Sequence, residues 1–244
     1  MPAPDLIQRQ VLKFLLPSSH AAALAARIGE LVPAFGYGGG PAVGRVTSLY
    51  LDSADLDLYR QSVERPESAA LIRLRWYSGP PGSPVFLELK HRDVERAVGV
   101  KQRYVLPRDT TAAFSGSEAQ LEAVAEHVET QAGAAIRGFL ARCHVPPRAA
   151  NLQPKLYVRY RRQAFQASED APLRITLDSR IIMAAAGGWP HERASHRTRR
   201  FPHAILEVKL EDGRPPWLDA LLPDAGLTPL ANFSKWVEGL TSLS

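Results

Sequence analysis

Short stretches in which apolar and polar residues alternate recur along the chain, and clusters of glycine and proline separate them. Alternation with a period of two is typical of β-strands that bury one face. Eight stretches therefore predict strands: Ile7–Leu16, Arg45–Asp52, Ala70–Tyr77, Val85–His91, Gly99–Leu106, Leu156–Ala167, Leu173–Ile182 and Ile205–Leu210.

Other stretches carry the wider spacing of amphipathic helices. They predict helices at Ser18–Leu31, Ser117–Arg142, Pro216–Leu222 and Phe233–Leu240. Strands interrupted by helices without strict alternation favour an α+β fold with a largely antiparallel sheet. No glycine or proline cluster separates halves of different composition, so we expect a single domain over residues 1–244, with a core from about residue 7 to about residue 240.

Composition narrows the class of protein. The 244 residues are 45% apolar, enough for a globular core, and the net charge of +5 favours an anionic partner. A single cysteine, Cys143, excludes an internal disulfide and a cysteine-rich zinc site. No secretion signal or apolar run of about 20 residues is present. We therefore expect a cytoplasmic protein with no membrane span, which a separate partner could hold at a membrane.

Charged residues recur on one face of six predicted strands. Arg73 and Arg75, for example, alternate with Ile72 and Leu74, so each pair lies on its own face. The charged faces carry Arg73, Arg75, Glu88, Lys90, Lys101, Arg103, Arg162, Arg174, Asp178, Glu207 and Lys209. A half-exposed sheet explains any one of these strands. Their shared composition favours a closed barrel with a polar interior and helices over its apolar outer face.

So many cations inside a barrel destabilise it by several kcal/mol unless a polyanion compensates their charge. The pattern therefore predicts a site for linear polyphosphate or a nucleoside triphosphate. Glu88, Asp178 and Glu207 share these faces. They could hold Mg²⁺ or Mn²⁺ together with substrate phosphates, or they could pair with neighbouring arginines and lysines. Glu207 is the favoured metal ligand of the three.

Several motifs together resemble a known family. They are Ser48–Asp52, Arg73–Tyr77, Glu88–Arg92, Lys101–Arg103, Tyr160–Phe165, Arg174–Asp178, Leu206–Lys209 and Ser234–Trp236. In order and spacing they resemble the polyphosphate polymerase domain of the vacuolar transporter chaperone (VTC) complex, one of the triphosphate tunnel metalloenzymes. The resemblance extends from about Arg9 to Gly239, nearly the whole chain.

The resemblance implies an eight-stranded antiparallel tunnel, open at both ends, that synthesises polyphosphate from ATP with Mn²⁺ or Mg²⁺. It implies that phosphates are gripped by Lys13, Arg73, Arg75, Lys90, Lys101, Arg162, Arg174 and Lys235. Tyr160 matches a tunnel tyrosine, and Glu207 matches the metal-binding glutamate. Arg103 and Lys209 join the expected substrate contacts because they share the charged faces.

Val11 departs from the family pattern, because tunnel enzymes commonly carry an acid two positions before the first-strand lysine, here Lys13. Its absence weakens a hydrolytic mechanism more than a polymerase. A triphosphatase or polyphosphatase, and a polyphosphate-binding module without turnover, remain alternatives. A nucleic-acid binder is disfavoured, because Trp76 and Phe165 fall on faces opposite the basic residues and leave no stacking platform there.

Three histidines accompany an arginine-rich segment, Trp189–Phe201. These are His191, His196 and His203, and they lack the spacing of a zinc site. A phosphate-attracting loop and an ordinary solvated basic loop both fit this segment.

Overall fold

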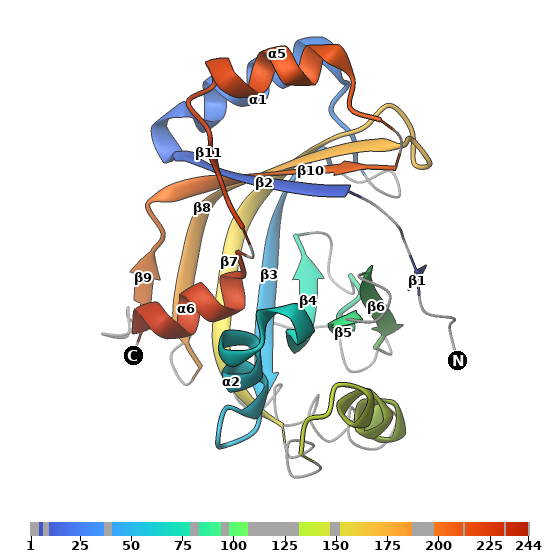
Figure 1. Ribbon diagram of the computed structural model, residues 1–244. Helices are drawn as coiled ribbons and strands as arrows, with labels where there is room; N and C mark the ends of the chain where they lie inside the picture. The colour runs from blue at the N-terminus through green and yellow to red at the C-terminus, as the bar shows by residue number, and fades with distance from the viewer. Residues whose placement is uncertain are drawn as a thin grey trace.

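An antiparallel β-sheet curls around a concave face in the computed structural model (Figure 1). The structure describes residues 5–6, 10–36, 41–78, 83–93, 98–106, 132–146, 152–186, 198–211, 213–231 and 233–243. The strands are β1 (Asp5–Leu6), β2 (Gln10–Pro17), β3 (Val43–Asp52), β4 (Ala70–Tyr77), β5 (Phe86–Asp93), β6 (Val98–Val105), β7 (Gln153–Phe165), β8 (Leu173–Ala185), β9 (Thr198–Arg200), β10 (His203–Leu210) and β11 (Thr228–Pro229).

The strand order is β1-β6-β5-β4-β3-β7-β8-β10-β2-β11, with β9 paired to β8. The long strands, β2 to β8 and β10, coincide with the predicted strands apart from shifts at their ends, which confirms the predicted fold class. Within the described ranges no pairing joins the two outer strands. The predicted barrel is therefore a tunnel-like curled sheet that hydrogen bonds do not close.

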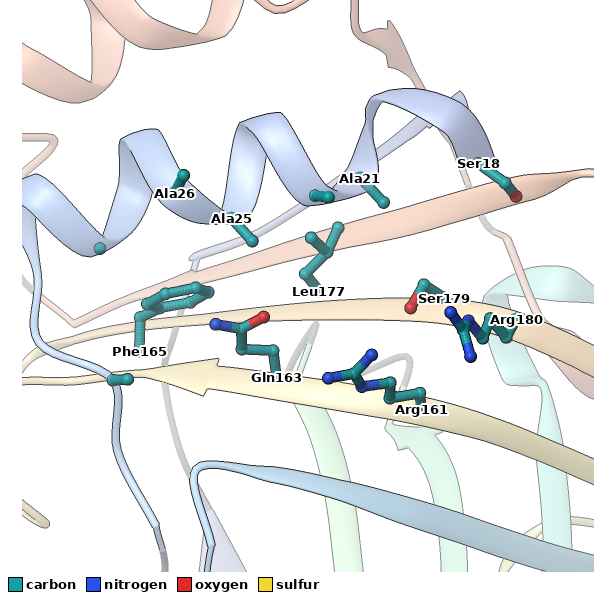
Figure 2. A pocket seen from close by; sticks show the side chains of 13 residues that line it. Ser18, Ala21, Ala25, Ala26, Arg161, Gln163, Phe165, Leu177, Ser179 and Arg180 are labelled. Atoms are coloured by element: carbon teal, nitrogen blue, oxygen red, sulfur yellow. The ribbon is translucent and has the colours of Figure 1, made fainter.

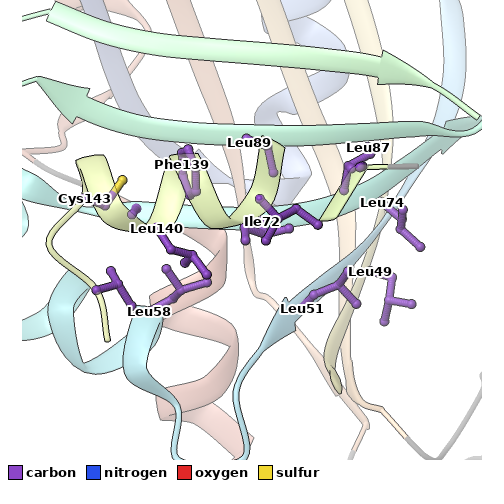
Figure 3. Close-up of a cluster of buried hydrophobic side chains, with 14 of the residues drawn as sticks. Leu49, Leu51, Leu58, Ile72, Leu74, Leu87, Leu89, Phe139, Leu140 and Cys143 are labelled. Carbon is purple, nitrogen blue, oxygen red and sulfur yellow. The ribbon is translucent and has the colours of Figure 1, made fainter. Parts of the chain in front are cut away.

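Helices cover the apolar outer face of the sheet in two places. The 3₁₀ turn η1 (Ser18–His20) leads into α1 (Ala21–Leu31), which packs with α5 (Pro216–Asp224) over β2, β8 and β10. Helical residues 132–142 pack over β4 and β5, where Phe139 and Leu140 meet Ile72 and Leu89 (Figure 3). Cys143 lies in this second core, and burial raises the pKa of its thiol to about 12.

Helix α6 (Lys235–Leu243) instead packs against the concave face. Trp236 stacks on Tyr50 of β3, with ring centroids 5.3 Å apart and planes at 16°. Gly239 lies so close to Leu156 of β7 that a Cβ added there would overlap its side chain. The concave face is thus apolar where α6 covers it, and the charged side chains occupy the remainder.

Helix α2 (Asp57–Glu64) and strand β9 were absent from the sequence-based prediction, as were the two-residue strands β1 and β11. Helix α2 has few buried apolar residues, and Leu56 precedes it with a left-handed φ of 59°. The buried Asp52 carboxylate holds its first turn by accepting hydrogen bonds from the Leu58 and Tyr59 amides. Strand β9 lies within the predicted basic loop and is exposed.

The start of the long predicted helix, residues 117–131, lies outside the described residues, as do Ile7 at the start of the first predicted strand and the histidines His191 and His196. His203 opens β10 and packs edge-on against Phe201, with ring centroids 5.6 Å apart. A helix long and apolar enough to cross a membrane is not found in the described segments.

Candidate anion-binding site

The strand registers bring the predicted charged faces together on the concave side of the sheet. Opposed pairs are Arg73 with Glu88, Glu88 with Arg103, Lys90 with Lys101, Arg162 with Asp178, Arg174 with Lys209, and Lys13 with Glu207. Because alternate residues of a strand share a face, each pairing places both side chains on the same side of the sheet. The predicted site residues of seven strands therefore converge, and Lys235 joins them from α6.

Glu88 is fully buried beneath three arginines. Arg73 donates from Nε at 2.8 Å and approaches with Nη2 at 2.6 Å, Arg103 donates from Nε at 2.9 Å, and Arg75 Nη1 lies 3.8 Å away. Burial alone would raise the pKa of Glu88, but the three guanidinium charges lower it far more. Glu88 is therefore an ionised counter-charge that holds the three arginines in place.

Asp178 forms a second buried pairing. Arg162 grips it with Nε at 2.7 Å and Nη2 at 2.8 Å, and Lys235 donates to Oδ2 at 2.7 Å. Burial opposes ionisation, yet Arg162 and Lys235 lower the pKa of Asp178 below its ordinary value. Since Lys235 opens α6, this ion pair also fastens the helix to the sheet.

Tyr160 lies between these two groups. Its hydroxyl accepts a hydrogen bond from Arg75 Nη2 at 3.1 Å. Its ring lies against the Arg162 guanidinium and the Lys235 ammonium, at 5.3 Å and 4.8 Å from the ring centroid. The tyrosine therefore separates cations and offers each of them a favourable contact through its ring or hydroxyl.

Glu207 is the least enclosed of the three carboxylates. Lys209 Nζ lies 3.3 Å from Glu207 Oε1, and the Glu207 side chain is 24% exposed. Burial would raise its pKa, but Lys209, Arg162 and Lys13 lower it well below the usual value. Lys13, directly across the ladder, donates from Nζ to the Phe233 carbonyl at 3.0 Å.

Lys90 is a partly buried lysine that lies close to other cations. Burial, Arg73 and Lys209 lower its pKa well below the usual lysine value, although Glu88 and Glu207 oppose this shift. A lysine in this position gains most from an added anion, because an anion restores the stability of its charged form.

The carboxylates differ in what they can do for a metal ion. Arginines already bind the carboxylate oxygens of Glu88 and Asp178. These two acids therefore pair with neighbouring basic residues, which was the alternative to metal binding. The Glu207 side chain is partly exposed, and its carboxylate is a ligand type that suits a hard divalent cation. Among the described residues no group of three or more His, Cys, Asp or Glu side chains could hold a metal. A metal at Glu207 would therefore need phosphate oxygens to complete its coordination.

The site also contains residues that carried no predicted role. Ser48 accepts a hydrogen bond from Arg75 Nε at 3.2 Å, and Tyr50 accepts one from Arg73 Nη1 at 3.2 Å. Spacing in the sequence could have identified them. Ser48 and Tyr50 are two residues apart on one strand, as are Arg73 and Arg75, the arginines that they bind. Val11 stands across the ladder from Lys209 and is 46% exposed, so no acid occupies that position.

The family model and the curated relatives that match this chain all concern the vacuolar transporter chaperone (VTC) complex. A family model described as the VTC domain matches residues 8–244. Vacuolar transporter chaperone complex subunit 4 of Schizosaccharomyces pombe is 30% identical over 230 residues, covering 81% of this chain and 32% of that protein. The same subunit of Trypanosoma cruzi is 26% identical, covering 81% and 28%. The chain thus spans about a third of the length of these relatives.

Solved structures share the fold at low sequence identity. A putative adenylate cyclase from Bacillus halodurans has a TM-score of 0.55 at 13% identity, covering 96% of this chain and 97% of the other. A putative adenylyl cyclase from Hippeastrum, described as having a dominant triphosphatase activity, has a TM-score of 0.53 at 14% identity, with 96% of both chains covered.

Proposed function

Because the chain belongs to the VTC domain family, we propose that its concave face binds ATP and inorganic polyphosphate and transfers the γ-phosphate of ATP to the growing polyphosphate chain. The observation that carries this proposal is the charge of the face. Its named residues comprise three carboxylates and the ten basic residues Lys13, Arg73, Arg75, Lys90, Lys101, Arg103, Arg162, Arg174, Lys209 and Lys235. A linear chain of phosphates supplies the missing negative charge along the whole face.

In phosphoryl transfer the protein mainly positions the reactants and stabilises charge, and it forms no covalent intermediate of its own here. A terminal oxygen of polyphosphate attacks the γ-phosphorus of ATP, the bond from that phosphorus to the β,γ-bridging oxygen breaks, and ADP leaves. Arg75 and Arg162 flank Tyr160 and are positioned to stabilise charge on the transferring group. Glu88 and Asp178 keep the arginines fixed before substrate arrives, so little reorganisation is needed.

A divalent metal, Mn²⁺ or Mg²⁺, fits Glu207 as one carboxylate ligand beside substrate phosphates, where it would neutralise phosphate charge. Lys13 lies across the ladder from that carboxylate, and Lys209 lies two residues along the same strand. Both lower the pKa of Glu207 and so favour its ionised form. They can also grip the phosphates next to it.

The wider assembly is also a proposal. The relatives are named as subunits of a vacuolar transporter chaperone complex, and this chain matches about a third of their length. We propose that a separate partner protein connects this chain to a membrane.

The deciding assay incubates the purified protein with ATP and Mn²⁺ and measures long-chain polyphosphate and orthophosphate separately. We expect chain growth, and a loss of about a hundredfold in Arg75→Gln, which removes one pre-positioned donor. Arg60→Gln on the exposed face of α2 is the matched control and should keep full activity.

Other outcomes would overturn parts of the proposal. Orthophosphate without chain growth would make the protein a triphosphatase, and tight polyphosphate binding with neither product would make it a binding module. Full activity in Arg75→Gln would remove the concave face from the mechanism.

A further inference from the structure

A pocket of about 520 Å³ lies on the outer face of the sheet, beneath α1 and over β7 and β8 (Figure 2). It is separate from the concave site, because its strand residues alternate with those of that site. Arg161 and Gln163 line the pocket, whereas Arg162 between them grips Asp178 on the other side. A pocket of this volume is in the usual range for small-molecule sites, about 300–1,000 Å³.

One wall of the pocket is apolar and is formed by residues with very small side chains. Helix α1 turns Ala22, Ala26 and Gly29 toward it, at helical spacing and with exposed surfaces. Phe165 and Leu177 rise from the strands opposite. A Cβ at Gly29 would lie 3.8 Å from the Phe165 ring, so larger residues in this wall would fill the space. The small side chains keep a slot open for a flat or narrow apolar body.

The other end of the pocket is cationic. Figure 2 shows Arg161, Ser179 and Arg180 gathered away from Phe165. A β-bulge produces this arrangement, because the β7–β8 register shifts between Arg159 and Arg161. Arg180 stands in the bulge with a φ of 52°, which is strained for a residue with a side chain. Bulges of this kind redirect side chains and are frequent beside binding sites.

Among the described residues, the arginines at this end form no ion pair with a carboxylate. No carboxylate is among the described residues that line the pocket. Two further arginines stand on the same outer face, since Arg45 is opposite Arg161 in the ladder and Arg159 lies two residues from Arg161. Such a cluster favours an anion, and guanidinium groups match phosphate oxygens with paired hydrogen bonds.

We propose that this outer pocket is a second binding site, for a small organic phosphate of nucleoside monophosphate size. Its phosphate lies on Arg161 and Arg180, and its apolar ring lies in the slot beneath α1. The Gln163 amide in the middle of the pocket offers both a hydrogen-bond donor and an acceptor to polar atoms of the ligand's ring.

The test uses AMP as the probe, with the concave site first saturated with tripolyphosphate. Calorimetric titration of the whole protein should then still detect AMP binding, tighter than that of adenosine or inorganic phosphate. Arg180→Gln should weaken AMP binding about tenfold through loss of a charged hydrogen bond. Ala26→Leu should weaken it at least as much by filling the slot.

Two substitutions serve as matched controls. Ala23→Leu lies on the same helix outside the pocket, and Arg200→Gln lies on exposed β9, so both should bind AMP normally. AMP binding that disappears once tripolyphosphate is present, or that survives unchanged in Arg180→Gln and Ala26→Leu, would overturn the proposal. Phosphate binding as tight as AMP binding would overturn it too, by showing a site for inorganic anions alone.

Discussion

The Tyr160 hydroxyl accepts a hydrogen bond from the Arg75 guanidinium at 3.1 Å, while the Tyr160 ring lies against Arg162 and Lys235. One side chain therefore links the arginines around Glu88 with the cations around Asp178. Substitutions that separate the hydroxyl from the ring can show which contact positions the site.

Tyr160→Phe removes the hydroxyl and keeps the ring. We expect the free energy of unfolding to fall by about 1 kcal/mol, the usual value of one such hydrogen bond. Tripolyphosphate binding should weaken only a few-fold, because Arg162 and Lys235 retain their ring contacts. Tyr160→Leu, which removes both contacts, should weaken binding much further in parallel titrations. Equal effects of the two substitutions would show that the ring contributes nothing.

Glu88→Gln leaves the buried Arg73 and Arg75, and the partly exposed Arg103, without their carboxylate. We expect a loss of about 3 kcal/mol in the free energy of unfolding, typical of breaking a buried ion pair. Glu64→Gln on the exposed end of α2 is the control and should change little.

The same variant tests the pKa of Glu88. A carboxyl whose pKa is lowered by folding contributes stability that is present above its unfolded pKa and is lost as pH falls below it. The free energy of unfolding, measured by denaturant titration, should fall from pH 6 toward acid in both proteins. In Glu88→Gln it should fall less steeply, by up to about 1.4 kcal/mol per pH unit. An unchanged slope would mean that Glu88 is not held ionised.

Lys90→Arg tests the lowered pKa of a partly buried lysine. In the wild-type protein, tripolyphosphate affinity should fall as pH rises through that lowered pKa, because the ammonium loses its charge before an ordinary lysine would. Arginine stays charged, so the variant should bind more evenly between pH 7.5 and pH 10. The remaining pH dependence is expected from Lys13, whose pKa burial also lowers. Identical profiles for the two proteins would contradict this.

Gly239→Ala tests the placement of α6. The new methyl group would overlap Leu156, so the helix must shift away from β7. We expect about 1–3 kcal/mol of destabilisation, as for other overpacked cores, and weaker tripolyphosphate binding because Lys235 moves with the helix. Gly213→Ala has open space around its new Cβ and should match the wild-type protein in both measurements.

Val11→Glu restores an acid opposite Lys209. We expect tighter Mn²⁺ binding by titration, and a higher ratio of orthophosphate to long-chain polyphosphate, because two carboxylates can hold a metal and orient water. Val63→Glu on exposed α2 is the control for added negative charge. A ratio that does not change would show that the first-strand acid does not decide the acceptor.

Alternation along the strands was sufficient to predict which charged residues share a face, because side chains alternate between the two faces along a regular strand. The position of α6 could not be predicted in this way. Trp236 and Lys235 belong to a short amphipathic pattern that fits either face of the sheet, and only their partners Tyr50 and Asp178 decide between them. The Arg180 bulge was equally hidden, since no glycine marks its left-handed backbone.

The place of β2 between β10 and β11 has a consequence for how the protein acquires its fold. Strands β3 to β6 and the β7–β8 pair join segments that are mostly close in sequence, whereas Leu15 of β2 pairs with Ile205 and Thr228. Closing so large a loop carries an entropic cost before any contact compensates it, and contacts between distant segments slow folding. We therefore expect β2 to dock late, so that Lys13 is among the last residues to join the site.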